Sequence, residues 1–421
     1  MNPIDINLTS EIGKLNGVIV HIPGPEVENM TPENAERALY SDILNLSIAL
    51  PEYHNFLGVL KKYSQVFEVR ELLTDILHNE HVKHELIAKI CRHEHQDNDK
   101  ICHYIEQIQD DDLAHQLIEG VQMEKDNLTR FLDDERFSIN PLPNFFFTRD
   151  ACFSYGNEVV ISKMANKVRD REAIIMDAIF NHHTSINAKT VNPIETYDRT
   201  GKASIEGGDV IIAREDILLI GTGSRTTTQG IDCMIEFLKE KPGRQHIIVQ
   251  ELPYKPESFI HLDMTFTFLD REHCMIFEPL IIHASRYLTI HIVIDDNKVT
   301  SIREEKNMLA ALEALGMPLK PIMCGGKNDQ FIMEREQWQS GANFVALEPG
   351  KVIGYGRNIN TIDALNKEGF EIIRAKDIVR GKDDIKNYKK VVVTIEGNEL
   401  SRGGGGARCM TMPFNRNTFK I

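Results

Sequence analysis

The sequence predicts an α/β fold of repeated small units, interrupted by a helical insertion. From residue 138 onward, short apolar strands such as EVVIS, DVIIA, ILLIG, HIIVQ, FVALE and VVVTI alternate with predicted helices at 171–181, 228–239 and 305–315. Glycine and proline mark the joins between these segments. Strands and helices that alternate along a chain in this way are typical of an α/β domain.

The N-terminal region fits the same pattern. Residues 17–22, GVIVHI, form an apolar run that ends in a Pro-Gly-Pro sequence, which predicts a buried strand entering a loop. Thr31 and Pro32 then provide a capping hydroxyl and a first-turn proline, and the following AERALYSDILNLSIAL has helical spacing. The segment VFEVR returns the chain to the sheet.

Residues 71–137 differ from both flanking regions. They contain one glycine, Gly120, and no proline, and their apolar residues recur at helical spacing. A helical bundle between two strand-rich regions is best interpreted as an insertion. We therefore expect residues 1–70 and 138–421 to form one catalytic α/β domain, and residues 71–137 to form an inserted helical domain.

The composition and net charge exclude some classes of binding partner. The chain has 421 residues, of which 42% are hydrophobic, and this is enough to bury a large core. Its formal net charge is −15, which argues against nucleic acid or an anionic membrane as a partner, because phosphate binding needs clustered Lys and Arg. An acidic protein is compatible with a small cationic substrate, although acidity also serves solubility alone.

The cysteines and the N-terminus indicate a cytoplasmic protein. The seven cysteines are odd in number and widely spread, which favours reduced thiols over a disulfide framework. The first residues do not have the basic and apolar regions of a signal peptide, and no apolar run approaches the ~18 residues of a membrane span.

Three polar segments adjoin predicted strands. In PLPNFFFTRD, residues 141–150, an aromatic triplet leads to Asp150 at the end of a predicted strand. Glu206 begins EGGD, whose two glycines allow a close approach of the backbone. In HLDMTFTFL, His261 and Asp263 lie on one face of a predicted strand, as an acid–base pair would. Taken singly, each of the first two segments is explained better by a solvated turn, and the third is explained equally well by a hydrogen-bonded pair at a sheet edge.

The segment 402–409, RGGGGARC, carries the strongest chemical signal. Four consecutive glycines give free backbone N–H groups and clearance beside Cys409. No Lys-Ser/Thr pair follows, which disfavours a phosphate loop, whereas a flexible loop with a structural thiol remains an alternative. Arg402 and Arg408 flank the glycines, and positive charge favours the thiolate over the thiol. A single cysteine with distant histidine and acidic residues is typical of a thiol nucleophile.

The Cys- and His-rich segment 91–103 is interpreted as a solvated helix face. It contains no C-x-x-C pair, and residues two apart on a helix point in different directions, so a metal site is disfavoured there.

Together the polar segments offer one thiol, one histidine and several carboxylates. A cysteine peptidase needs at most one carboxylate, whereas several carboxylates around a thiol would bind a cation. A guanidinium is a planar cation with five N–H donors that pair with carboxylates in forked geometry. Its resonance-stabilised carbon needs a strong, soft nucleophile and an acid for the leaving amine.

The motifs PLPNFFFTRD, EGGDV, HLDMTFT and SRGGGGARCMTMP, in this order, resemble those of bacterial arginine deiminases. PGPEVENMTPENAERALYSDI and EREQWQSGANFVALEPGKVIGYGRN are also similar to that family, so the resemblance covers nearly the whole chain. It implies the five-bladed, pseudo-symmetric α/β propeller of guanidino-group-modifying enzymes, with an inserted helical bundle. It also implies hydrolysis of free L-arginine to L-citrulline and ammonia.

The resemblance implies a role for each matching residue. Cys409 would attack the guanidinium carbon and form a covalent amidino intermediate. His261 would protonate the departing ammonia and then activate water. Asp150 and Asp263 would bind the guanidinium nitrogens, and Glu206 would orient His261. The implied substrate-binding residues are Asn144, Phe147, Arg169, Arg225 and Arg402, of which Asn144, Arg169 and Arg225 match positions that anchor the α-carboxylate and Arg402 matches a gating arginine.

The resemblance implies no cofactor and no metal, because the thiol and the imidazole supply the chemistry. The expected partners are L-arginine as a small-molecule substrate and further copies of the chain in a homo-oligomer, with no nucleic acid and no membrane. Two alternatives stay open: another guanidino-group enzyme, such as an amidinotransferase or a methylarginine hydrolase, and an arginine-binding protein without catalysis.

Overall fold

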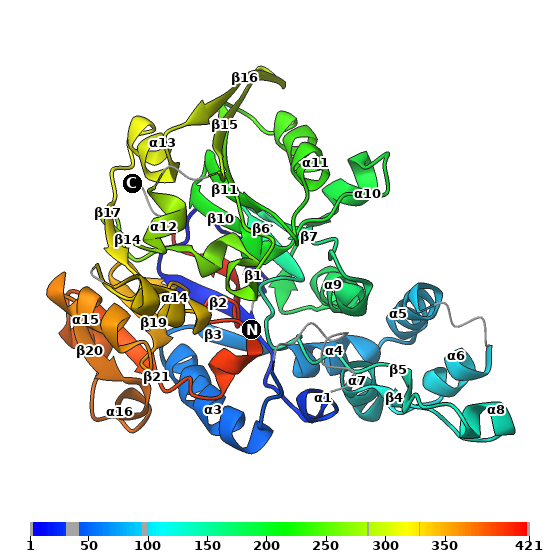
Figure 1. Cartoon of the computed structure of the whole chain (residues 1–421). Helices are drawn as coiled ribbons and strands as arrows, with labels where there is room; N and C mark the ends of the chain where they lie inside the picture. Colours follow the sequence, from blue (N-terminus) through cyan, green and yellow to red (C-terminus); the bar gives the residue numbers. More distant parts are fainter. Residues whose placement is uncertain (1–2, 31–41, 95–98, 284–285, 328, 419–421) are drawn as a thin grey trace.

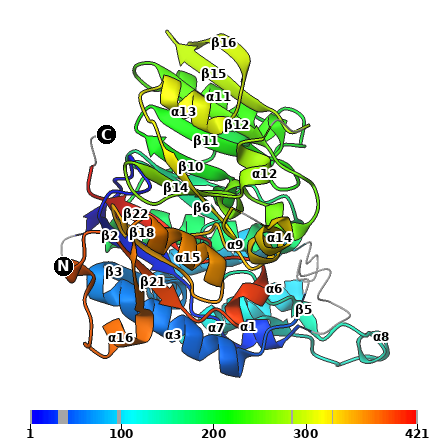
Figure 2. The same cartoon turned by 60° about the vertical axis from the view of Figure 1, so that its left-hand side comes forward.

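The structure is a computed structural model that describes residues 3–30, 42–94, 99–283, 286–327 and 329–418. A large body of sheets and helices carries a helical arm on one side (Figure 1). The view in Figure 2 shows the same arm reaching away from the body.

Five sheets of the described residues repeat one pairing pattern. In each, a central strand pairs antiparallel with one neighbour and parallel with the other. The pattern confirms the predicted series of small α/β units. The three strands of each unit, with the central strand in the middle, are β22–β2–β3 (Met412–Arg416, Leu15–Val20, Gln65–Glu68), β6–β7–β9 (Cys152–Tyr155, Glu158–Ile161, Thr190–Val191), β10–β11–β12 (Val210–Arg214, Ile217–Thr222, Gln245–Glu251), β13–β14–β17 (Phe266–Phe268, His273–Ile276, Lys320–Met323) and β18–β19–β21 (Val345–Glu348, Lys351–Tyr355, Val391–Ile395).

Additional strands extend two of these sheets or pair separately. The hairpin β15–β16 (Thr289–Asp295, Lys298–Glu305) adds to β12, and β20 (Glu371–Arg374) adds to β21. Two pairs stand apart, β1 with β8 (Ile4–Asp5, Ile186–Asn187) and β4 with β5 (Val121–Gln122, Phe137–Ile139). The fold is therefore mixed α/β, as the sequence predicts.

A helix lies in the chain between each central strand and its parallel neighbour. Parallel neighbours need such a crossover, because a short turn can join only antiparallel strands. These helices are α3 (Leu46–Tyr63), α9 (Lys167–His182), α11 (Thr228–Lys239), α13 (Met308–Ala314) and α15 (Ile359–Lys367). The body also contains α1 (Pro25–Glu28), α10 (Pro193–Tyr197), α12 (Glu278–Ile281), α14 (Gln330–Trp338) and α16 (Ala375–Val379).

The predicted helix boundaries are partly right. Helix α11 has the predicted bounds, whereas α9 starts four residues earlier than predicted. Helix α13 begins at Met308 because the preceding residues continue strand β16. The predicted helix start at Thr31 and Pro32 lies outside the described residues, and α3 follows Asn45, whose side chain accepts the N–H of Ser47.

Helices fill the predicted insertion. Helix α4 (Val69–Leu77) begins where it does because the Glu68 carboxylate accepts the N–H groups of Arg70 and Glu71 and caps the first turn. Its apolar face joins that of α9 in one hydrophobic cluster, which includes Leu72 and Ile179. The arm thus shares a core with the body, and its status as a separate domain stays a prediction. Its other helices are α5 (Glu80–His93), α6 (Asp99–Glu106), α7 (Asp110–Glu119) and α8 (Leu128–Phe131).

Two predicted strands are wrong. The segment 143–150 forms consecutive turns. His261 precedes a 3-10 turn, Leu262–Met264, and the strand starts only at Phe266. The apolar residues that predict these strands are apolar because both turns are buried in the core, where most of their residues are inaccessible.

The prediction that all seven cysteines are reduced is also wrong for one pair. Cys91 at the end of α5 and Cys102 in α6 form a disulfide, with a Cα–Cα distance of 6.2 Å. The other five cysteines are free and buried. The bridge lies in the Cys- and His-rich segment that we interpret from the sequence as a solvated helix face.

Among the described residues, no helix combines the length and the apolar character needed to cross a membrane.

Candidate active site

A small cavity in the body gathers most of the residues predicted for the site. Its volume is about 40 Å³. Glu206 and Asp263 lie directly behind its wall, where they contact His261 and Cys409 respectively. The predicted residues that line the cavity are Asn144, Phe147, Asp150, Arg169, Arg225, His261 and Cys409, joined by Gly403, Gly404 and Gly405 of the glycine loop.

Backbone hydrogen bonds hold the site segments against one another. The N–H of Arg149 donates to the carbonyl of Cys409, at 3.1 Å, and the N–H of Gly207 donates to the carbonyl of Asp150, at 3.1 Å. The turns at 143–150 therefore connect the cysteine loop to the EGGD segment. This explains why the segment forms turns although the sequence predicts a strand: its backbone groups pair with other site loops.

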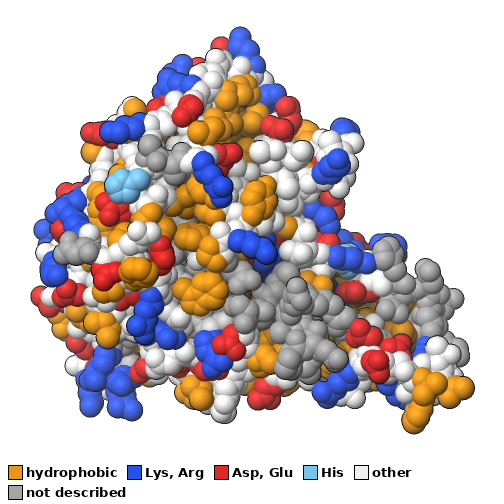
Figure 3. Space-filling model, in the orientation of Figure 1, with side chains coloured by type: hydrophobic (Ala, Val, Ile, Leu, Met, Phe, Trp, Pro, Cys, Tyr) orange, Lys and Arg blue, Asp and Glu red, His pale blue; other side chains and the backbone are white. Residues whose placement is uncertain are grey.

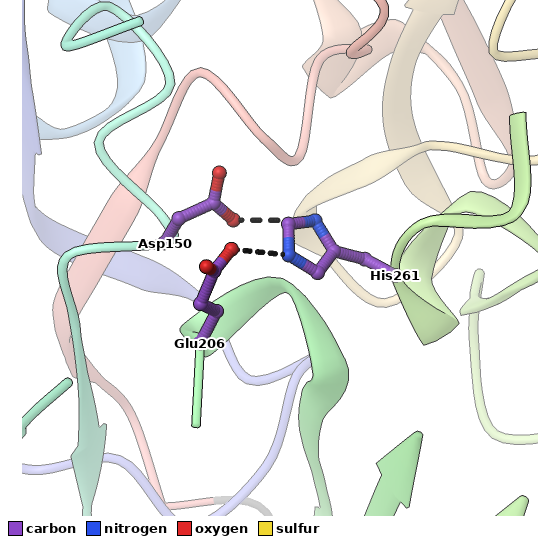
Figure 4. A group of neighbouring side chains, drawn as sticks. All are labelled: Asp150, Glu206 and His261. Atoms are coloured by element: carbon purple, nitrogen blue, oxygen red, sulfur yellow. Dashed lines mark hydrogen bonds and ion pairs between the residues drawn. The ribbon is translucent and has the colours of Figure 1, made fainter. Parts of the chain in front are cut away.

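His261 lies among carboxylates, as Figure 4 shows. Its Nε2 is 2.8 Å from an oxygen of Glu206, and its Nδ1 is 3.5 Å from an oxygen of Asp150. Burial lowers the pKa of His261, but the carboxylates of Asp150 and Glu206 outweigh that effect and raise it to about 9. The imidazole is therefore a cation at neutral pH and can donate a proton.

Glycine at 208 permits this arrangement. A Cβ at this position would lie 2.6 Å from Nδ1 of His261 and 2.7 Å from Oδ1 of Asp150. A side chain would separate the imidazole from its carboxylates. The sequence-based expectation of a close backbone approach at EGGD is therefore confirmed.

Cys409 has different neighbours. Its sulfur accepts a hydrogen bond from Nδ2 of Asn343, at 3.2 Å, and lies 3.6 Å from an oxygen of Asp263. Asp263 also accepts a hydrogen bond from Arg408, at 2.8 Å. His261 and Asp263 are thus two residues apart in the chain but contact different residues of the site, Glu206 and Cys409 respectively, and His261 directly precedes the 3-10 turn that contains Asp263.

The thiol is protonated in this environment. Burial, followed by the negative charges of Asp263 and Asp150, raises the pKa of Cys409 well above its usual value. Arg408 opposes this only weakly, since its guanidinium pairs with Glu11 at 3.0 Å and with Asp263. The expectation that the flanking arginines stabilise a thiolate is therefore wrong, because paired arginines carry little net positive charge to the sulfur.

Two predicted arginines reach the cavity. Arg169 donates to Asp150, at 2.8 Å, and pairs with Glu172, at 2.7 Å. Nη1 of Arg225 lies 4.0 Å from Glu206 and has no hydrogen-bond partner, although it is buried. Oδ1 of Asp150 is also buried and unbonded. A cation and an anion with unused hydrogen-bonding capacity thus border the same small space.

Arg402 does not join the others. Its guanidinium pairs with Asp42, at 2.7 Å, and with Glu399, at 3.3 Å, and it is absent from the residues that line the cavity. The structure therefore brings together nine of the ten predicted site residues and directs Arg402 toward the outer surface.

Sequence reasoning missed two buried residues of the site. Asn343 bonds the thiol, and its carbonyl oxygen accepts the N–H of Arg408, at 2.8 Å. Asp209 accepts the N–H of Leu262, at 2.9 Å, which fixes the turn after His261, and burial raises its pKa to about 7. Their positions in the motifs SGANF and EGGD were the available signal.

Asp150, Glu206 and His261 also offer three atoms within 4.8 Å of one another, a spacing that suits a metal ion. However, a cationic side chain already lies beside the two carboxylates. Nη1 of Arg169 lies 2.8 Å from Asp150 and 4.0 Å from Glu206. Because the Arg169 guanidinium would compete with a metal ion for both carboxylates, we interpret the cluster as an acid–base site.

Known proteins resemble the chain over nearly its whole length. The family model described as arginine deiminase matches residues 36–416. Arginine deiminases of Listeria monocytogenes serotype 4a and Borrelia garinii subsp. bavariensis are 32% and 34% identical to the chain, each aligned over 99% of the chain and 98% of the relative. The arginine deiminase of Mycoplasma capricolum subsp. capricolum is 33% identical, over 98% of the chain and 97% of that protein. The chain belongs to the arginine deiminase family.

Solved structures with the same fold are more distant. The amidinotransferase SxtG from Microseira wollei, of the saxitoxin biosynthetic pathway, has a TM-score of 0.54 at 14% identity, with 98% of each chain covered. A dimethylarginine dimethylaminohydrolase adduct with S-methyl-L-thiocitrulline has a TM-score of 0.50 at 12% identity and covers 95% of this chain and 100% of that one. At these identities the likeness concerns the fold alone.

Proposed function

We propose that this member of the arginine deiminase family hydrolyses free L-arginine to L-citrulline and ammonia, with Cys409 as the nucleophile. The observation that carries the proposal is one cavity lined by a buried thiol and a cationic imidazole, with carboxylates beside both. A binding protein would need the carboxylates but not the thiol.

Substrate binding requires an exchange of partners. The guanidinium of arginine would pair with Asp150 and Asp263, and its α-carboxylate with Arg169 and Arg225. Arg169 now pairs with Asp150, so this carboxylate is not free for the substrate. We therefore expect the substrate to displace Arg169 from Asp150, after which Arg169 is free to bind the carboxylate. The hydrogen-bonding capacity left on Arg225 and Asp150 supports this exchange.

The bound cation would also activate the nucleophile. It offsets the negative charge that holds the proton on Cys409, so the thiol loses its proton to solvent. The thiolate attacks the guanidinium carbon and forms a C–S bond. His261 gives its proton to one nitrogen, the C–N bond breaks, and ammonia leaves, which gives a covalent amidino-cysteine intermediate.

Water then completes the reaction. The neutral His261 takes a proton from water, and the resulting hydroxide adds to the same carbon. The C–S bond breaks, the electron pair returns to the sulfur, and L-citrulline is released. One water is consumed and one ammonia is formed for each citrulline. Glu206 would orient His261 throughout, because their 2.8 Å contact fixes the ring.

We also propose that the five α/β units form a five-bladed, pseudo-symmetric propeller, with residues 71–137 as an inserted helical domain. The repeated pairing of central strands supports five equivalent blades. A cytoplasmic location and a homo-oligomeric state belong to the same proposal, and neither a cofactor nor a metal has a part in it.

The decisive experiment incubates the purified chain with L-arginine after treatment with a chelator and follows citrulline and ammonia together. One citrulline for each ammonia supports the proposal. Ornithine with two ammonia molecules would indicate a dihydrolase instead. Transfer of the amidino group to an added amine, or activity on methylated arginine alone, would support a different guanidino-group enzyme.

A further inference from the structure

A groove beside the catalytic cavity carries an excess of cationic side chains. Its volume is about 690 Å³. It lies where the end of α5 and the start of α9 meet the loops 201–204 and 224–227. In Figure 3, blue and pale-blue side chains gather at this junction between the arm and the body. The volume is within the ~300–1,000 Å³ range of small-molecule sites.

The charge in this groove is not neutralised. Lys163 pairs with Asp170, at 2.7 Å, and Asp170 is the acidic residue of the lining. Arg92, Lys167 and Lys202 form no ion pair with any part of the chain that the structure describes. Three uncompensated cations around one groove, in a chain with a net charge of −15, reverse the sign of the local field.

Two helices add to this field. Lys167 is the first residue of α9, and the side chain of its N-cap residue, Asn166, makes no capping hydrogen bond. Thr227, which caps the start of α11, also lines the groove. The positive ends of two long helices thus approach the same space as the cations. Helix ends would not define a site alone, but here they reinforce an independent cluster of side chains.

The lining of the groove indicates which class of anion it would bind. A single phosphate would engage only part of the three cations and the two helix ends. The lining contains no aromatic ring except the imidazole of His93, so no planar surface is built to stack a base. We propose that this groove binds a small polyphosphate of the pyrophosphate or triphosphate class, recognised by charge and not by a nucleoside.

The site would be separate from the catalytic cavity but adjacent to it. The Ser204 hydroxyl in its wall donates to the carbonyl of Arg225, at 2.9 Å, and the N–H of Ala165 donates to Glu206, at 3.0 Å. The groove thus lies against the back of two segments that carry site residues. A bound polyphosphate is a second ligand, distinct from the substrate of the proposed reaction.

The test is a calorimetric titration of the full chain with pyrophosphate at low salt. Lys202→Glu and Arg92→Glu should each weaken binding by about tenfold or more, because each replaces an attraction with a repulsion. Lys298→Glu is the matched control, since it makes the same charge change on exposed strand β16 and should retain binding within about twofold. Arg225→Gln should also retain it, which separates this groove from the arginines of the catalytic cavity.

Several outcomes would overturn the proposal. They are the absence of pyrophosphate binding, an equal loss in Lys298→Glu, or a loss confined to Arg225→Gln. Thermal denaturation of each variant shows whether it is folded. Tripolyphosphate and ATP should bind with similar affinity, and a much tighter ATP complex would refute recognition without a base. None of these readouts depends on arginine turnover, so they stay informative if the proposed hydrolysis is wrong.

Discussion

His261 and Cys409 face one cavity, and carboxylates surround both. The carboxylates of Asp150 and Glu206 raise the pKa of His261 to about 9, and those of Asp263 and Asp150 help to raise the pKa of Cys409 above its usual value. The negative charge of these carboxylates therefore has opposite effects on the reactivity of the two groups. It keeps the imidazole in the charged form, which can donate a proton, and it keeps the thiol in the neutral form, which cannot attack.

This difference indicates what each side needs from a substrate. The histidine side is prepared before binding, whereas the thiol side needs a cation to offset the carboxylates. A guanidinium supplies that cation and is also the group to be attacked. A neutral substrate of the same shape would leave the thiol protonated. Substitutions at Cys409 and Asp263 affect the thiol, and a substitution at Glu206 affects the imidazole, so the two sides can be tested separately.

The largest effect is expected from loss of the thiol. Cys409→Ala should reduce kcat by more than about 10⁴-fold, because no other described side chain at the cavity can replace the nucleophile. L-arginine should still bind, and loss of the buried thiol should if anything strengthen the attraction of the carboxylates for the cation. Turnover and calorimetric binding check the two statements. Substantial remaining ammonia release would eliminate Cys409 as the nucleophile.

Removal of a carboxylate on the thiol side should have the next largest effect. Asp263→Asn should lower kcat/KM by about 10²- to 10³-fold, because it removes a charge-assisted partner of the substrate cation. It should also lower the pKa of Cys409, which the pH dependence of thiol alkylation measures in the free enzyme. Asp363→Asn on the exposed face of α15 is a matched control. An unchanged alkylation profile would contradict the assignment of Asp263 to the thiol.

On the histidine side, Glu206→Gln should shift the pH profile. Glu206 helps to hold the pKa of His261 at about 9, so its loss should move the alkaline limb of kcat/KM to lower pH. At pH 8 we expect a rate loss of about tenfold or more. Rates between pH 6 and 10 check this, and an alkaline limb that stays in place would show that the limb belongs to another group.

The same histidine should affect stability. Its folded-state pKa of about 9 is above the ordinary value of 6.5, so the charged imidazole stabilises the fold fully below pH 6.5. That contribution should be lost as the pH rises through about 9. Melting temperatures of the wild type should therefore fall more between pH 7 and 9.5 than those of His261→Asn. Parallel melting curves for the two proteins would contradict the raised pKa.

The smallest effect is expected at Arg402. It pairs with Asp42 and Glu399 on the outer side, where an exposed ion pair contributes about 0–1 kcal/mol. Arg402→Gln should change kcat/KM by less than about fivefold and leave the pKa of Cys409 unaltered. A loss of 100-fold would show that Arg402 enters the cavity during the reaction, in a conformation other than this one.

Particular residues show how far sequence reasoning reached. The repeated strands and the helical insertion follow from apolar periodicity, which is a local property of the chain. The site residues were predicted from short motifs and from the family resemblance, and the structure brings nine of the ten together. Local patterns failed where tertiary contacts override them. The segments at 143–150 and around His261 are predicted as strands, yet both form turns because their backbone groups bond to distant parts of the chain.

The protonation states of the site residues and the ion-pair partners of the arginines could not be predicted from the sequence. Arg402 and Arg408 adjoin the cysteine loop in sequence, which suggests a thiolate, but each pairs with acids brought in from elsewhere in the chain. Asn343 and Asp209 needed the folded arrangement to acquire a role, since each acts through contacts with residues more than 50 positions away. The bridge between Cys91 and Cys102 likewise depends on how α5 and α6 meet.

The sequence by itself determined the α/β units, the family resemblance and the chemical groups available for the reaction. Only the tertiary structure decided which charged groups lie next to one another, such as Arg169 and Asp150. It also decided that the thiol of Cys409 is neutral while the imidazole of His261 is charged. The physical reason is that a pKa depends on burial and on charges within a few ångströms, and the fold sets both.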